Sequence, residues 1–178
     1  MQSLGLASII LFGFLLHAEP PKEDHLVIKE KEITVSGNTS FGKFECTYYV
    51  NSIKDTLSFT NNFSPDQFHF EIPVGDFACG NFLLNKDFKK TIKAKDYPTA
   101  HVKVANLTRK NKHYTCDLYL ELVGKKFHFK DFNLVQNGDR LWGNLTLDFE
   151  LLDLVPPSRL GGLIKVDEEL HLFMHLSS

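Results

Sequence analysis

Hydrophobic and polar residues alternate along most of the chain with a period of two, the pattern of strands that are buried on one face. The clearest alternation is in residues 67–74, 114–122, 141–151 and 164–176. Further strands are predicted at 26–36, 44–49, 56–59, 99–107 and 126–134. About eight antiparallel strands of this kind must either close into a barrel or stack as a sandwich, and strand counting alone does not choose between them.

Glu168 is the one charged residue on the apolar face of the last alternating segment, 164–176. A carboxylate on an inner face is costly unless it is paired or hydrated. Two interpretations follow. Glu168 marks the mouth of a barrel or a polar contact for a ligand headgroup, or a bulge at the strand end turns it outward.

One segment has helical periodicity instead. The pattern predicts a helix over 86–95, with Asn85 as its N-cap and Pro98 blocking its continuation. Phe88 and Ile92 lie on one side, so we expect the helix to lie across the sheet with this apolar edge inward. The opposite side carries a lysine stripe, which consists of Lys86, Lys89, Lys90 and Lys93. The stripe is either a solvated face or a surface that docks on an anionic membrane or a lipid headgroup.

The N-terminus predicts export. Residues 4–16 form an apolar run that is too short to span a bilayer and is typical of a signal peptide. We therefore expect a signal peptide over 1–18, a flexible segment over 19–25 and a single domain over 26–177, located in the periplasm or outside the cell. No later apolar segment is long enough to cross a membrane, so the mature chain is expected to be soluble.

Composition and motifs argue against several classes of function. The net charge of −2, with both signs interspersed, disfavours nucleic-acid binding. No signature of a hydrolase, a nucleotide-binding loop or a zinc site occurs. His171 and His175 would lie about 13 Å apart on a strand, too far to share one metal ion. The sequence therefore predicts no metal, no cofactor and no enzymatic activity.

The inner faces of the predicted strands are the candidate ligand site. A small barrel either fills its interior with side chains or holds one small apolar ligand, and the sequence is compatible with both. The inward-facing residues that would line a cavity are Phe44, Tyr48, Phe68, Phe70, Val102, Val104, Leu118, Leu120, Phe127, Phe129, Leu145 and Leu147.

Two segments carry a resemblance to a known family. They are CGNFLLNKDFKKTIKAKDYPTAHVKV at 79–104 and the closing PPSRLGGLIKVDEELHLFMHL. From about Val35 to its C-terminus, the chain resembles the YceI-like family of bacterial lipocalin-like barrels, whose better-known members bind polyisoprenoid lipids. The resemblance implies an all-β fold, an antiparallel lipocalin-like barrel of about eight strands with one short helix.

The chain has three cysteines, and an exported protein is expected to pair two of them. Spacing alone does not identify the pair. The resemblance implies a disulfide between Cys46 and Cys79. Cys116 has apolar neighbours and is predicted to be a buried free thiol.

Two functions are compatible with the sequence. The first is an exported, soluble lipid-binding protein that holds an isoprenoid or a similar apolar chain inside its barrel. The alternative is a closed barrel with a structural or protein-interaction role in the cell envelope, acting through exposed residues such as Trp142 and Phe173 or through the lysine stripe. A cavity of several hundred Å³ would favour the first function. The sequence specifies neither the ligand nor the oligomeric state.

Overall fold

The computed structural model describes residues 24–40, 42–53, 55–59, 68–110, 113–157 and 166–178. The predicted signal peptide, 1–18, and most of the predicted flexible segment, 19–25, lie outside these residues. Within the described part of the chain, no helix has both the length and the apolar character needed to cross a membrane.

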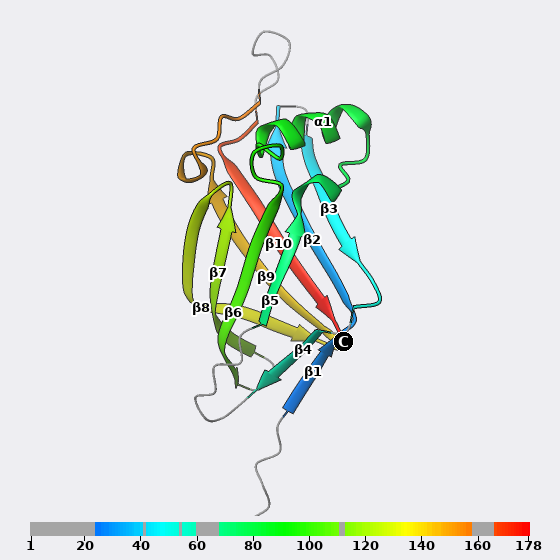
Figure 1. The fold of residues 1–178 in the computed structure, drawn as a ribbon, viewed down its shortest axis with the longest axis vertical. Helices are drawn as coiled ribbons and strands as arrows, with labels where there is room; N and C mark the ends of the chain where they lie inside the picture. The colour runs from blue at the N-terminus through cyan, green and yellow to red at the C-terminus, as the bar shows by residue number, and fades with distance from the viewer. Residues whose placement is uncertain (1–23, 41, 54, 60–67, 111–112, 158–165) are drawn as a thin grey trace, which may run out of the picture.

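Eight antiparallel strands form one curled sheet in the order β3-β2-β10-β9-β8-β7-β6-β5 (Figure 1). Their bounds are β2 (Glu30–Thr39), β3 (Gly42–Val50), β5 (Phe68–Pro73), β6 (Thr99–Lys110), β7 (His113–Leu122), β8 (Lys125–Asn137), β9 (Arg140–Asp148) and β10 (Glu169–Ser177). The other two strands, β1 (Asp24–Ile28) and β4 (Asp55–Phe59), pair with each other. The prediction of a lipocalin-like antiparallel barrel of about eight strands is confirmed.

The period-two pattern identifies the core correctly in most strands. In β7, the residues at 114, 116, 118, 120 and 122 are all buried. The pattern fails at Leu151, which is exposed because β9 ends at Asp148 and a 3-10 helix, η2 (Glu150–Leu152), follows it. Glu168 is also exposed, just before β10 begins, and its carbonyl accepts a hydrogen bond of 2.8 Å from the Phe149 N–H. The carboxylate is therefore hydrated, which agrees with both interpretations of Glu168.

The predicted single strand over 26–36 is two strands, because the extended structure is interrupted at Lys29. The Lys29 N–H donates to the carbonyl of Ser177 at 2.8 Å, at the end of β10. This hydrogen bond fixes the start of β2 beside its neighbour, while β1 leaves the sheet to pair with β4.

The two edge strands, β3 and β5, do not pair with each other, so the barrel has a seam. After β5, a 3-10 helix, η1 (Val74–Asp76), leads to Ala78, which exchanges two backbone hydrogen bonds of 2.9 Å with Thr47 of β3. The next residue in this crossing, Cys79, forms a disulfide with Cys46. The predicted disulfide is therefore confirmed, and it closes the seam covalently.

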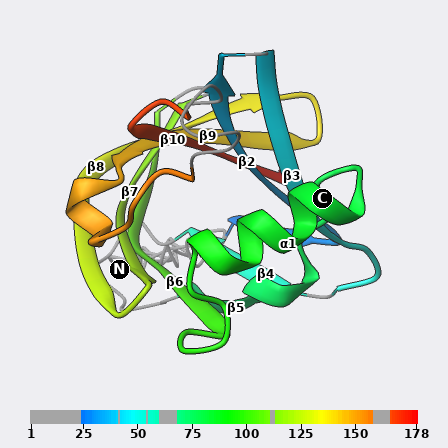
Figure 2. The ribbon, with the colours of Figure 1, turned by 90° about the horizontal axis from the view of Figure 1, so that it is seen from above.

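The helix α1 (Phe82–Thr91) begins four residues before the predicted start. Its N-cap is Asn81, whose Oδ1 accepts from the Leu84 N–H at 2.9 Å. The prediction of Asn85 as the N-cap is wrong, because that side chain accepts from the Cys79 N–H at 2.7 Å instead. The helix also ends before the predicted Lys95. Seen from above, α1 lies on the side of the barrel between β3 and β6 (Figure 2).

Candidate functional site

A cavity of about 450 Å³ lies beneath α1, at one end of the barrel. Its walls come from α1, from the β2–β3 hairpin, from β10 and from the segment that follows β9. The lining is almost entirely apolar, and its residues are Thr39, Phe44, Cys46, Leu83, Leu84, Asp87, Phe88, Thr91, Ile92, Phe149, Pro157, Val166 and Leu170. A space of this size and character suits an apolar chain.

The helix α1 forms the roof of the cavity because of its amphipathic spacing. Leu83, Leu84, Asp87, Phe88 and Thr91 recur three and four residues apart, so they share the face that lines the cavity. The ring of Phe88 packs 5.3 Å from that of Phe77, centroid to centroid, and Ile92 is buried just after the helix. The predicted inward edge of Phe88 and Ile92 is confirmed.

The cavity reaches the molecular surface at the first turn of α1. Leu83 and Leu84 line the cavity, yet 52% of Leu83 and 37% of Leu84 remain exposed. The disulfide lies in the wall of the cavity, since Cys46 is one of the lining residues. The roof is thus joined to the wall by the covalent bond that precedes the helix.

Of the twelve residues predicted to line a ligand site, only Phe44 lines this cavity. Five others surround a void of about 60 Å³ in the middle of the barrel: Phe70, Val102, Leu118, Leu120 and Leu145. Six line neither space, and these are Tyr48, Phe68, Val104, Phe127, Phe129 and Leu147. The inner faces therefore largely fill one another. As ligand contacts, these residues stay a prediction.

The residues that α1 contributes to the cavity were not predicted. The predicted helix starts at Lys86, which left Leu83 and Leu84 in a loop. The signal was present in Asn81, which is as good an N-cap residue as Asn85. A helix that starts after Asn81 places Leu84, Phe88 and Thr91 on one face.

A buried lysine was also missed. Lys31 of β2 is only 6% exposed, and its Nζ lies 4.4 Å from the centroid of the Phe70 ring and 5.8 Å from that of Phe68. The aromatic faces attract the ammonium group electrostatically. Lys31 pairs with Val50 and Leu176, at the end of the sheet away from the cavity, and is not part of the candidate site.

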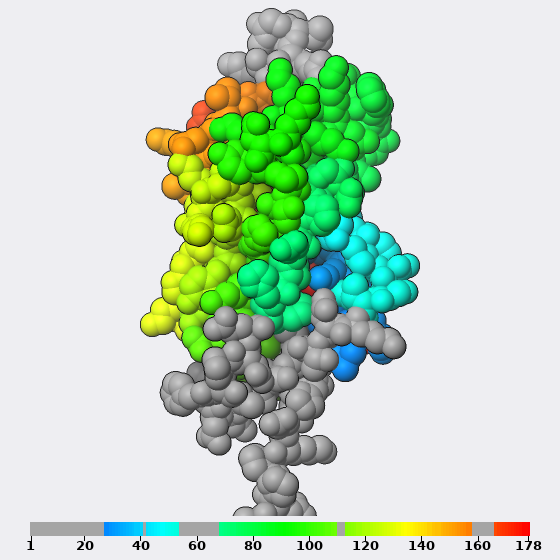
Figure 3. Space-filling view, viewed as in Figure 1, coloured from blue at the N-terminus to red at the C-terminus, as the bar shows by residue number. Residues whose placement is uncertain are grey.

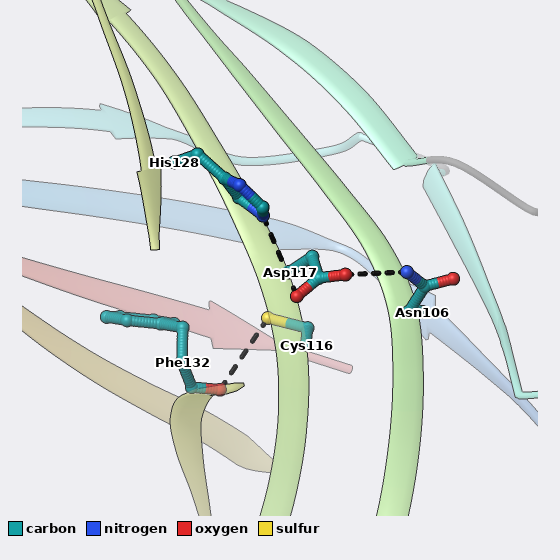
Figure 4. Close-up of polar contacts among 5 residues, drawn as sticks. All are labelled: Asn106, Cys116, Asp117, His128 and Phe132. Carbon is teal, nitrogen blue, oxygen red and sulfur yellow. Dashed lines mark hydrogen bonds and ion pairs between the residues drawn. The ribbon is translucent and has the colours of Figure 1, made fainter. Parts of the chain in front are cut away.

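The free thiol of Cys116 lies on the inner face of β7, with its Sγ 3.8 Å from the carbonyl oxygen of Phe132 (Figure 4). Burial, followed by the charge of Asp117, raises the pKa of Cys116 to about 12. The thiol is therefore protonated at neutral pH and is a poor nucleophile. The prediction of a buried free thiol is confirmed.

Polar side chains on the outer face of the same strands interact with one another. Asp117 lies between Asn106 and His128 of the neighbouring strands (Figure 4). The Asn106 Nδ2 donates to Asp117 at 2.6 Å, and the His128 Nε2 lies 3.7 Å from the other carboxylate oxygen. His175 of β10 similarly lies 3.4 Å from Glu32. Across the residues described, no three His, Cys, Asp or Glu side chains are grouped to hold a metal ion.

The sequence matches no protein-family model and none of the curated proteins compared with it. Two solved structures share the fold. BcnA of Burkholderia cenocepacia aligns with a TM-score of 0.61 at 17% sequence identity, over 84% of this chain and 96% of its own. A polyisoprenoid binding domain from Saccharophagus degradans, implicated in plant cell wall breakdown, aligns with a TM-score of 0.54 at 11% identity, over 87% and 97%. At the level of the fold, the YceI-like resemblance is confirmed.

Proposed function

We propose that the protein is an exported lipid-binding protein that holds one apolar chain in the cavity beneath α1. The observation that carries this proposal is the cavity itself, about 450 Å³ in volume and lined mostly by aliphatic and aromatic side chains. Cavities of several hundred Å³ with this lining are typical of small-molecule sites. The fold neighbour from Saccharophagus degradans is a polyisoprenoid binding domain, so an isoprenoid chain is the first ligand to test.

The affinity of such a site depends on chain length. Each methylene group that moves from water into the cavity contributes about 0.8 kcal/mol, or about four-fold in Kd. Association itself costs at least about 4 kcal/mol, so a ligand must bury more than about five such groups before binding becomes favourable. The site therefore selects long apolar chains over short ones until the cavity is full.

The polar residues of the cavity support binding rather than catalysis. They are Thr39, Asp87 and Thr91, with no histidine or thiol beside them in the lining. A single carboxylate with two hydroxyl groups suits contact with a polar end group of the ligand. We therefore propose that the protein binds its ligand without converting it.

The disulfide supports the proposed location. Disulfides persist in oxidising compartments such as the bacterial periplasm and the extracellular space. Cys46 and Cys79 are both buried in the bridged state. Together with the apolar run at 4–16, the bridge favours export to one of these compartments.

A closed barrel that acts through its surface is the second candidate. The filled middle of the barrel, with a void of only about 60 Å³, favours it. Trp142 would serve such a surface, since it is exposed on β9 and its ring lies 3.8 Å from that of His175. The cavity under α1 gives the first function more support, because a purely structural barrel does not require that space.

Native mass spectrometry tests the first function. The full chain is exported to a bacterial periplasm, purified without detergent and then titrated with isoprenoid alcohols of increasing length. We expect a saturable one-to-one complex whose affinity rises with chain length. Thr91→Trp places a large ring in the cavity and should abolish the complex, whereas the matched control Lys90→Trp, on the exposed side of α1, should not. A wild-type protein that stays free at all ligand concentrations, or equal binding by Thr91→Trp, would overturn the proposal.

A further inference from the structure

Exposed apolar side chains gather around the opening of the cavity. Among the described residues, the two most exposed large apolar side chains are Val155 at 82% and Phe82 at 81%. Phe82 begins α1 beside Leu83, and Val155 lies two residues before Pro157, so each is adjacent to the cavity lining. Leu151, in the same segment as Val155, is also exposed. Burial in an apolar phase would stabilise all of these groups.

The exposed apolar side chains of α1 and those of the segment 149–157 lie at one end of the molecule. In the space-filling view, α1 and the segment 149–157 lie side by side at the end opposite the C-terminus (Figure 3). Just after the C-terminal end of α1, the Lys93 Nζ donates to the carbonyl oxygen of Asp153 at 2.9 Å. The cavity is lined by residues of both segments, and each segment carries exposed apolar side chains; these exposed side chains are called the apolar surface below.

Lysines surround this apolar surface on the α1 side. Lys86 and Lys89 follow Phe82 at helical spacing, so all three share the face opposite the cavity, and Lys90 adjoins them. All three lysines are exposed. Residues 82–97 contain five lysines and two aspartates, and one of these aspartates, Asp87, faces the cavity. The outer face of the helix is thus positively charged.

The segment 149–157, on the other side of the cavity opening, carries carboxylates. Glu150 and Asp153 are exposed there, and Asp153 forms an ion pair with Lys125. This pairing, followed by the charge of the nearby Lys93, lowers the pKa of Asp153, so the carboxylate is ionised and has lysines beside it. The segment 149–157 therefore contributes mainly apolar contact through Leu151 and Val155, and α1 contributes the positive charge.

We propose that this end of the barrel docks on an anionic lipid bilayer, so that a lipid passes between the bilayer and the cavity without crossing water. The inference rests on the proposed lipid-binding function and adds its donor or acceptor surface. A bilayer fits because it offers both negative headgroups for Lys86, Lys89 and Lys90 and an apolar layer for Phe82 and Val155. Each lysine near an anionic surface strengthens binding by about five-fold.

Vesicle sedimentation tests the docking surface. The full chain is mixed with vesicles of phosphatidylcholine that contain about one-third phosphatidylglycerol, and with vesicles of phosphatidylcholine alone. We expect the triple variant Lys86→Gln/Lys89→Gln/Lys90→Gln to bind the anionic vesicles about 100-fold more weakly than the wild type. The matched control, Lys29→Gln/Lys130→Gln/Arg140→Gln, removes the same charge from exposed residues elsewhere and should bind as the wild type does.

A second pair of variants tests the apolar part of the docking surface. Phe82→Ser should weaken vesicle binding, whereas Tyr49→Ser, an exposed aromatic residue on β3, should not. Failure of the wild type to sediment with anionic vesicles, or equal sedimentation with both kinds of vesicle, would overturn the docking proposal. So would equal binding by the two triple variants.

A separate titration with an isoprenoid alcohol in the absence of vesicles distinguishes the two proposals. If the helix-lysine variant binds the alcohol normally but not the vesicles, the docking surface is supported independently of the cavity. If no protein binds the alcohol while the wild type binds anionic vesicles, the cavity proposal fails and the surface still binds membranes.

Discussion

Removing the disulfide should destabilise the barrel and disorganise the cavity in a single step. The bond joins β3 to the residues that start α1, at a seam where the edge strands are not paired. The Cys79 N–H also donates to Asn85 within the helix, so the bridge positions the first turn of α1. The perturbation is the double variant Cys46→Ala/Cys79→Ala, compared with the oxidised and the reduced wild type.

The size of the effect follows from the loop that the bond closes. The two cysteines are 33 residues apart. Restricting the unfolded chain by a loop of that length contributes about 4 kcal/mol at 25 °C in the chain-entropy description. With a urea dependence of about 2 kcal/mol per molar, the midpoint of unfolding should fall by about 2 M. Loss of two buried sulfur atoms adds to this figure in the double variant.

Urea unfolding, followed by the fluorescence of Trp142, the only tryptophan in the chain, measures the change. The reduced wild type keeps both side chains, so its difference from the oxidised protein reports the cross-link alone. The double variant differs from the reduced wild type only in packing. An isoprenoid titration of all three proteins, in the absence of urea, then shows whether the cavity survives.

We expect the reduced protein and the double variant to bind the ligand more weakly than the oxidised protein, because the roof of the cavity is no longer tied to its wall. The reasoning is refuted if the reduced protein unfolds within about 0.5 M urea of the oxidised protein and binds equally well. The seam would then be held by the Thr47–Ala78 hydrogen bonds and by the packing of α1 alone.

The remaining predictions concern the buried thiol, the start of α1 and a tight turn. Because the pKa of Cys116 rises from 9.0 to about 12 on folding, its stabilising effect is full below pH 9 and is lost as the pH rises towards 12. Urea unfolding across this range should show a steeper loss for the wild type than for Cys116→Ala, and equal slopes would contradict the assignment. Asn81→Ala removes the acceptor for Leu84 and should cost about 1 kcal/mol in urea unfolding; an unchanged midpoint would mean that the cap is dispensable. Gly124→Ala should cost about 1–2 kcal/mol, because Gly124 has a φ of +72° and a Cβ would lie 2.7 Å from the Tyr97 ring. A melting temperature equal to that of the wild type would refute this.

The fold could be predicted from the sequence because the alternation of half-buried strands is local. Each position of β7 reports its own face, whatever the partner strand is. The seam could not be predicted in this way, because it depends on which edge strands fail to meet. The Cys46–Cys79 pairing came from family resemblance, since spacing leaves several pairings of three cysteines.

The start of α1 could not be predicted because two equivalent signals compete. Asn81 and Asn85 are both favourable N-caps, and tertiary structure chooses between them. The disulfide holds Cys79, and Gly80 with a φ of +84° turns the chain so that Asn81 caps the helix. Asn85 is then inside the helix and binds back to Cys79. The first turn of α1 contains Leu83 and Leu84, so these two cavity-lining residues were not predicted as part of the site.

The location of the cavity was beyond the sequence for a different reason. Alternation shows which residues face inward, but whether space remains depends on the size of the side chains that they meet across the barrel. In the middle, Phe70 of β5, Leu118 of β7 and Leu172 of β10 are among the residues around a void of only about 60 Å³. At the end beneath α1, the cavity is covered by a helix and not by a paired strand. A helix with its side chains is about 10–12 Å across, so its backbone lies farther from the residues that it faces.

The seam links this geometry to the proposed exchange of lipid. None of the residues of α1 is fully buried. The helix is held by the disulfide before it, by the Asn85–Cys79 hydrogen bond, by Phe88 against Phe77 and by Ile92 after it. Moving α1 breaks no hydrogen bond of the sheet, since neither edge strand pairs with it. If the protein binds lipid as proposed, we expect the lipid to enter beneath the helix while the barrel stays intact. The same helix presents Phe82 and its lysines outward, so the proposed contact with a bilayer would involve the element that covers the cavity.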